Sequence, residues 1–127
     1  MAAAKPKGAF IVIEGTDGSG KSTQTQLLID GLTSQGYRVQ TFHFPRYGQP
    51  AAYFAEQYLA GAYGSLTEVG PHRTALFYAL DRYDASAEIR TALDQGAVVI
   101  CDRYVGSNMA HQGAKIADPS ERQRYFE

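Results

Sequence analysis

The sequence has 127 residues, a length that fits one domain. Its hydrophobic fraction of 44% and charged fraction of 20% are ordinary for a globular domain, and the formal net charge is −1. This balance excludes recognition of nucleic acid or of an anionic membrane by bulk charge, so we expect neither partner. The single cysteine, Cys101, excludes an internal disulfide. Because the apolar run Phe10–Ile13 is too short for a signal peptide or a membrane span, we expect a cytoplasmic protein.

The first elements alternate between strand and helix. Residues 1–8 are small or charged and predict a loose N-terminal tail. The short, β-branched run Ala9–Ile13 predicts a parallel strand that is buried on both faces. Leucines then recur at helical spacing between Lys21 and Gln35, and Gly36 stands where a helix C-cap is expected.

The alternation continues along the chain. Tyr37–Phe44 predicts a second strand, and residues 50–60 predict a helix that a glycine-rich loop follows. Pro71 opens a long helix that reaches Gln95, with Gly96 as its stop, and Ala97–Cys101 predicts a third strand. This order predicts an α/β fold with a parallel sheet and helices on both faces.

The last residues predict a further helix. Asp118 suits the N-cap, Pro119 the first turn and Glu121 the third position, and no stop signal follows before Glu127. Three parallel strands would leave an open hydrophobic edge. We therefore expect residues 9–127 to be the N-terminal part of a domain truncated after its third strand. The alternative is a naturally short domain with an exposed C-terminal helix.

A glycine-rich segment lies between the first predicted strand and the first predicted helix. Backbone N–H groups in such a loop can converge on phosphate oxygens at the positive end of the helix. Lys21 can reach the β- and γ-phosphates of a nucleotide, and the Ser22 hydroxyl can bind Mg²⁺. A chance match is the alternative, but the strand-to-helix context is the one that the motif requires. The segment Gly15-Thr16-Asp17-Gly18-Ser19-Gly20-Lys21-Ser22 fits GxxxxGK[ST].

Two arginines follow strands at the edge where open α/β sheets bind ligands. Arg46 comes after the Phe44-Pro45 turn, and its alternative is a solvated surface arginine. Arg103 follows Asp102 after the third strand. Asp102 can hold Mg²⁺ through water and Arg103 can clamp a phosphate, whereas a structural ion pair is the alternative.

The long helix carries a possible base-binding pair. Tyr78 and Arg82 are four residues apart and share one face, where a ring and a guanidinium could stack on a base and hold a phosphate. Phe77 would point away and is better suited to the core. The alternative is a packing stripe, which would consist of Leu76, Leu80 and Tyr83.

The remaining reactive residue types carry weaker signals. The histidines lack metal-ligand spacing and are interpreted as surface or hydrogen-bonded residues, and Cys101 as an inert core residue. The segment from Ser107 to Gly113 is polar enough to read a base edge. The three histidines are His43, His72 and His111.

Taken in order, these segments resemble thymidylate kinases, which are P-loop nucleoside-monophosphate kinases. The resemblance implies a P-loop NTPase fold and transfer of the γ-phosphate of ATP to dTMP, giving dTDP in dTTP biosynthesis. It also suggests a homodimer packed through helices. The segments that carry it are Glu14–Thr23, Phe44–Tyr47, Leu80–Arg82, Asp102–Tyr104 and Ala110–Gly113.

The resemblance also implies roles for individual residues, with ATP and Mg²⁺ as cofactors. The expected catalytic residues are Lys21, Asp17, Arg46 and Arg103, and the expected metal-binding residues are Ser22 and Asp102. ATP would contact Gly15, Thr16, Gly18, Ser19, Gly20, Lys21, Ser22 and Thr23. The dTMP would contact Asp17, Phe44, Arg46, Tyr47, Tyr78, Arg82, Arg103, Asn108 and Gln112.

Some features depart from the family pattern and leave alternatives open. His111 stands where relatives often have tyrosine, and Gly18 stands where some relatives carry an arginine that others supply from a lid. Because the sequence ends before any lid, we expect residues 1–127 alone to be inactive. The rivals are another P-loop deoxynucleoside or nucleoside-monophosphate kinase and a non-catalytic nucleotide-binding fragment.

Overall fold

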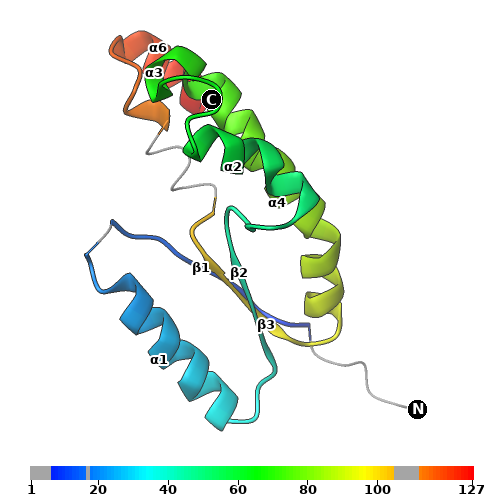
Figure 1. Cartoon of the computed structure of the whole chain (residues 1–127). Coiled ribbons are helices and arrows are strands. Elements are labelled where there is room, and N and C mark those ends of the chain that lie inside the picture. Colours follow the sequence, from blue (N-terminus) through cyan, green and yellow to red (C-terminus); the bar gives the residue numbers. More distant parts are fainter. Residues whose placement is uncertain (1–6, 17, 105–111) are drawn as a thin grey trace. The chain divides into compact units, whose positions relative to one another are not determined.

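The computed structural model describes residues 7–16, 18–104 and 112–127 (Figure 1). They form two compact units. Unit 1 takes in the described residues of Met1–His43 and Ala85–Tyr104, and unit 2 those of Phe44–Asp84 and Val105–Glu127. In these described parts, no helix is both long and apolar enough to cross a membrane.

Unit 1 contains a parallel sheet, as the sequence predicts. Its strands are β1 (Phe10–Ile13), β2 (Val39–His43) and β3 (Val98–Asp102), in the order β1-β3-β2. In the register, Ile13 and His43 both pair with Asp102. The carboxyl ends of all three strands therefore lie at the same level of the sheet.

The strands differ in burial because of their places in the sheet. The central strand β3 is buried from Val98 to Cys101, since it has a neighbour on each side. The expectation that β1 is buried on both faces is wrong: Phe10 is 42% exposed, and the other three residues of the strand are half-buried. Among the described strands, β1 has β3 as its single neighbour and forms an edge.

Glycine ends the first helix, α1 (Lys21–Ser34), as its position predicts. Gly36 has a φ of 90°, and its N–H donates to Thr33 O at 3.0 Å. The N–H of Tyr37 donates to Leu32 O at 3.1 Å. This pair of bonds is a Schellman motif, which satisfies carbonyls that the helix leaves unpaired.

The long helix α4 (Pro71–Asp94) runs through both units and also ends at a left-handed glycine, Gly96, with a φ of 84°. Its buried face includes the fully buried Asp81. The alternative interpretation, in which Leu76, Leu80 and Tyr83 form a packing stripe, is wrong. These three side chains are 56%, 43% and 79% exposed. The other buried residues of this helix are Thr74, Ala85, Ile89 and Ala92.

Short helices build unit 2, together with the N-terminal part of α4. A 3₁₀ turn at Pro50–Ala52 leads into α2 (Tyr53–Leu59), α3 covers Leu66–Val69, and α6 covers Pro119–Phe126. Phe77 packs in an aromatic cluster, as expected, with ring centroids 5.7 Å from Phe54, 5.8 Å from Tyr63 and 6.4 Å from Tyr58.

Two helix starts in unit 2 are capped by side chains. Asp118 Oδ2 accepts from the Glu121 N–H at 3.2 Å, which confirms the predicted N-cap of α6. Helix α3 lies where the sequence pattern predicts a glycine-rich loop, so that prediction is wrong for residues 66–69. Ser65 and Glu68 form a reciprocal capping box there, and the Ser-x-x-Glu spacing is a signal that could have revealed it.

Candidate functional site

The glycine-rich loop joins β1 to α1, as the sequence predicts. Gly18 and Gly20 have φ values of 79° and 85°, which residues with a side chain rarely adopt. The Ser19 N–H donates to Thr16 O at 3.2 Å and closes a turn within the loop. Asp17 lies outside the described residues. The loop thus needs glycine at these two positions to reach the helix start.

The N-terminus of α1 has no side chain among the described residues that accepts hydrogen bonds from its first backbone N–H groups. Gly20 is the N-cap residue, no side chain caps it, and no acidic residue stands in the first turn. The first N–H groups of a helix have no partner within the helix and carry a partial positive charge. Such an end, which begins at Lys21 and Ser22, suits an anionic ligand such as a phosphate.

Lys21 and Asp102 meet at the carboxyl edge of the sheet. Lys21 Nζ donates to Asp102 Oδ1, and the side chains are 10% and 24% exposed. The second oxygen, Asp102 Oδ2, lies 3.1 Å from His43 Nδ1. The register explains this cluster, because Asp102 and His43 are paired at the ends of β3 and β2. The structure therefore joins two predicted site residues and adds His43.

The electrostatics of this cluster favour an ionised Asp102. Burial by itself would raise the pKa of Asp102, but the hydrogen bonds from Lys21 and His43 outweigh burial and lower it below its ordinary value. Asp102 is therefore a carboxylate at neutral pH. It offers oxygen atoms of the kind that Mg²⁺ prefers.

Arg103 and Tyr104 are fastened to the end of β1. The Arg103 N–H donates to Ile13 O at 3.0 Å, and the Tyr104 N–H donates to Glu14 Oε1 at 3.0 Å. Arg103 has a φ of 67°, an uncommon value for a residue with a side chain. Such values persist where surrounding contacts enforce them, and they cluster at functional sites. Glu14 therefore anchors this segment, a role that no pattern in the sequence predicted.

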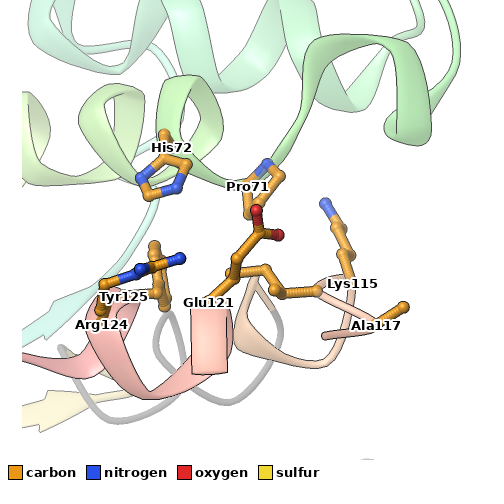
Figure 2. Close-up of a pocket in the computed structure, with 8 residues that line it drawn as sticks. Pro71, His72, Lys115, Ala117, Glu121, Arg124 and Tyr125 are labelled. Atoms are coloured by element: carbon orange, nitrogen blue, oxygen red, sulfur yellow. The ribbon is translucent and has the colours of Figure 1, made fainter. Parts of the chain in front are cut away.

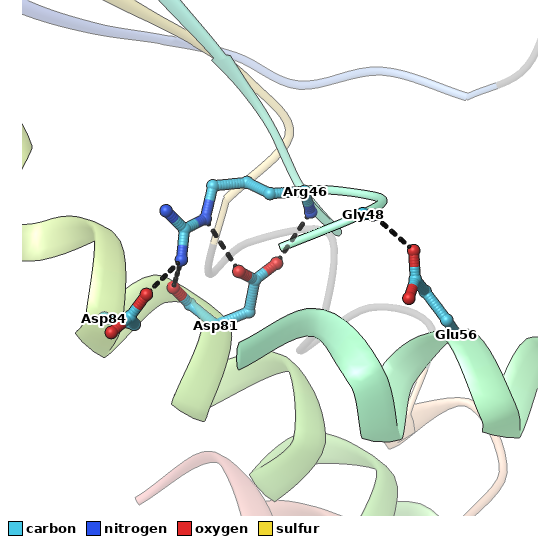
Figure 3. A network of polar contacts seen from close by, with 5 residues as sticks. All are labelled: Arg46, Gly48, Glu56, Asp81 and Asp84. Carbon is cyan, nitrogen blue, oxygen red and sulfur yellow. Dashed lines mark hydrogen bonds and ion pairs between the residues drawn. The ribbon is translucent and has the colours of Figure 1, made fainter. Parts of the chain in front are cut away.

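The other predicted arginine, Arg46, lies in unit 2 and contacts helix α4 (Figure 3). Arg46 Nε donates to Asp81 Oδ1 at 2.7 Å, and one terminal nitrogen donates to Asp84 Oδ2 at 2.9 Å. With a side chain only 12% exposed, Arg46 is not the solvated surface arginine of the alternative interpretation. The sequence did not predict that Asp81 and Asp84 are the partners of Arg46. A buried carboxylate such as that of Asp81 requires a partner of opposite charge or a hydrogen-bond donor.

Phe44 and Tyr47, which lie before and after Pro45-Arg46, differ in exposure. Phe44 is buried at 6% exposure, whereas Tyr47 is 62% exposed. Gly48, which follows, donates its N–H to Glu56 Oε1 at 2.7 Å (Figure 3). The turn therefore presents Tyr47 outward between two anchored residues.

The predicted base-reading residues of unit 2 lie in two neighbourhoods. Tyr78 and Arg82 are half-buried on α4, and burial raises the pKa of the Tyr125 phenol while the nearby charge of Arg82 partly offsets this. Gln112 is buried at 4% exposure, and its Oε1 accepts from Lys115 Nζ at 2.7 Å. Asn108 lies outside the described residues.

A pocket of about 490 Å³ lies in unit 2 between the start of α4 and helix α6 (Figure 2). It contains none of the predicted site residues, but it adjoins two of them. Its Lys115 bonds to Gln112, and its Tyr125 lies within the electrostatic reach of Arg82. The lining residues are Pro71, His72, Lys115, Ile116, Ala117, Glu121, Arg124 and Tyr125.

The structure thus groups the predicted residues by unit. Unit 1 holds the phosphate loop, Asp102 and Arg103, the last of which is expected at the acceptor phosphate. Unit 2 holds the other described residues expected at the acceptor nucleotide, which are Phe44, Arg46, Tyr47, Tyr78, Arg82 and Gln112. Among the described residues, no group of three or more His, Cys, Asp or Glu side chains could hold a metal. Cys101 is buried, as expected, and burial raises its pKa to about 11.

A parallel sheet whose first strand leads through GxxxxGKS into a helix defines the P-loop nucleotide-binding fold. Comparison with known proteins narrows this class. The family model of thymidylate kinase matches residues 13–121. The chain therefore belongs to the thymidylate kinase family.

Individual relatives agree with this family. The chain is 37% identical to a thymidylate kinase of Exiguobacterium over 107 residues, which cover 84% of the chain and 49% of the relative. It is 39% identical to that of Clavibacter sepedonicus over 116 residues, 90% of the chain and 53% of the relative. A solved thymidylate kinase structure from Candida albicans matches with a TM-score of 0.74 and 31% identity, over 91% of the chain and 48% of its own. The chain spans about half the length of the curated relatives it matches.

Proposed function

We propose that this chain forms the phosphate-loop half of a thymidylate kinase, which transfers the γ-phosphate of ATP to dTMP and releases ADP and dTDP. The observation that carries the proposal is the contact between Lys21 and Asp102 at the carboxyl edge of the sheet, beside the uncapped start of α1. Phosphoryl transfer asks a protein mainly for positioning and for neutralisation of charge, and these groups suit both tasks.

On the nucleotide side, the loop and the start of α1 bind the phosphates of ATP. Lys21 neutralises the β- and γ-phosphates, so its ammonium must exchange the Asp102 carboxylate for phosphate oxygens when ATP arrives. Ser22 and Asp102 offer the hydroxyl and carboxylate oxygens that would hold Mg²⁺. A bound Mg²⁺ would supply further positive charge at the phosphates. No base is required, because the attacking oxygen of dTMP is already anionic.

On the acceptor side, Arg103 holds the phosphate of dTMP, and a phosphate-binding role of Arg46 stays a prediction of the resemblance. Tyr78 stacks on the thymine, while Arg82 and Gln112 contact its edge. The half-buried positions of Tyr78 and Arg82 support this proposal, since each side chain keeps an exposed part that can contact a ligand while the helix stays intact.

The proposal extends to the assembly of the protein. The exposed face of α4 made of Leu76, Leu80 and Tyr83 supports a homodimer packed through helices, as the resemblance suggests. Light scattering should then give twice the mass of one chain, and Leu80→Lys should shift the protein to a monomer. An unchanged mass would contradict this interface. We also propose a cytoplasmic location.

A chimera tests the proposed reaction. Residues 1–127 are joined to the part of the Clavibacter sepedonicus thymidylate kinase that follows its matched region, and ADP release is measured with dTMP, dUMP, dCMP, AMP and thymidine. We expect kcat/KM to be highest for dTMP. A clear preference for another acceptor would favour a different P-loop kinase, and ATP binding without any transfer would favour a non-catalytic module. The Candida albicans relative is described as having broad substrate specificity, and for this reason several acceptors are compared.

A further inference from the structure

We propose that Arg46 is a positioning residue, whose guanidinium fastens the turn at residues 45–48 to helix α4 instead of binding a phosphate. The inference concerns the acceptor side of the proposed function and rests on that function only for its ligand. It replaces the expectation that Arg46 grips the phosphate of dTMP.

The contacts of Arg46 use one carboxylate twice (Figure 3). Its backbone N–H donates to Asp81 Oδ2 at 2.8 Å, and Nε donates to Asp81 Oδ1 at 2.7 Å. The same terminal nitrogen that bonds to Asp84 also reaches Asp81 O at 3.2 Å. Backbone and side chain are therefore tied together to one turn of α4, which fixes the orientation of the arginine.

Because Asp81 is buried, its carboxylate needs the ion pair with Arg46. Its side chain is 0% exposed, and among the described residues the ion-pair partner it has is Arg46. A buried carboxylate that loses its partner is strongly destabilising, since desolvation is no longer compensated. Moving Arg46 away to bind a ligand would leave Asp81 in that state.

The charge of the cluster also argues against a phosphate. One guanidinium faces the two carboxylates of Asp81 and Asp84, so the three groups together carry a net charge of −1. A phosphate dianion that approached Arg46 would meet this surplus of negative charge. The guanidinium is therefore already neutralised by the protein.

A second contact holds the other side of the turn. The Gly48 N–H donates to Glu56 Oε1 at 2.7 Å, so the turn is tied to α2 as well as to α4. Tyr47, 62% exposed, lies between the two tied residues. The geometry points to a preorganised turn in which Arg46 acts through its neighbours.

The first arm of the test needs no ligand. Urea unfolding is measured for the 127-residue chain, for Arg46→Met, for Asp81→Leu and for the double variant, with Arg90→Met on the exposed side of α4 as the matched control. We expect Arg46→Met to lower the folding equilibrium constant roughly 100-fold or more. The double variant should recover most of that loss, because it no longer buries an unpaired carboxylate. Additive losses in the double variant would overturn the proposal.

The second arm separates positioning from phosphate binding. Calorimetric titrations with dTMP and with thymidine, which lacks the phosphate, are compared for the chimera with the wild-type sequence and for the chimera with the double variant. We expect the two affinities to change by the same factor. A loss for dTMP that exceeds the loss for thymidine by about tenfold or more, the scale of one charged hydrogen bond, would show that Arg46 binds the phosphate. If wild type binds neither ligand, the proposed function fails, while the unfolding arm still decides the role of Arg46.

Discussion

Lys21 donates a hydrogen bond to Asp102, although the two residues are 81 positions apart in the chain. The contact joins the start of α1 to the end of β3 and places an ammonium beside a carboxylate at the edge where α/β sheets bind ligands. The contact with Lys21 favours the ionised form of Asp102 by lowering the pKa of that carboxyl, and it holds the two side chains together. The pair links the stability of the fold to the chemistry of the proposed site.

Lys21→Ala is expected to lower the turnover of the chimera by about 100-fold or more, the scale of losing one preorganised donor to a developing charge. Steady-state ADP release with dTMP measures the effect. Lys7→Ala, at an exposed position outside the loop, serves as the control and should retain full activity. Near-normal turnover of Lys21→Ala would remove Lys21 from the mechanism.

Asp102→Asn should unfold at a lower urea concentration than wild type at neutral pH, because it loses the ion pair with Lys21. The pKa of Asp102 is lower in the folded chain than its ordinary value of 3.8. Its stabilising contribution is therefore present above that value and is lost as the pH falls through the folded pKa. The two unfolding midpoints should approach each other as the pH falls below 3.8 and converge once it is below the folded pKa of Asp102. A difference that persists at lower pH would contradict the assignment.

Cys101 should resist alkylation in the folded chain. It is fully buried, and with a pKa of about 11 only about one thiol in a thousand is ionised at pH 8. Because it is the single cysteine, mass spectrometry after iodoacetamide treatment reports on it alone. Complete labelling is expected in 6 M guanidinium on the order of minutes, at the thiolate fraction of an unfolded cysteine. Rapid labelling of the native chain would mean that β3 is accessible.

Asp118→Ala should destabilise unit 2 by about 1 kcal/mol, the usual contribution of a helix N-cap. The Asp118 carboxylate accepts from the Glu121 N–H and is the side-chain cap of α6. Urea unfolding followed by circular dichroism measures the change, and Asp118→Asn, which retains an acceptor oxygen, should stay close to wild type. Equal losses in both variants would mean that the hydrogen bond is not the cause.

The features that the sequence predicted well depend on local signals. Gly36 and Gly96 end helices because the left-handed conformation favours glycine, and neighbours within six residues determine these caps. The order of strands and helices follows from the same kind of pattern. The phosphate loop was likewise readable, because its function depends on backbone geometry within one short segment.

The features that were missed depend on residues far apart in the chain. The pairing of Arg46 with Asp81 spans 35 positions, and no local pattern reveals which arginine a buried carboxylate will meet. The exposure of Phe10 follows from the place of β1 at the edge of the described sheet, which strand composition does not specify. The contacts between side chains of the site therefore depend on tertiary structure, whereas its helices, strands and phosphate loop follow from local sequence.

Direct observation of the product tests the central claim. The chimera is incubated with Mg-ATP and dTMP, and ³¹P NMR follows the phosphorus species over time. We predict that ADP and dTDP appear together in equal amounts, and that both form about 100-fold or more slowly when Lys21 is replaced by alanine. Release of ADP with inorganic phosphate and no dTDP would contradict the assignment of this chain to a thymidylate-phosphorylating enzyme.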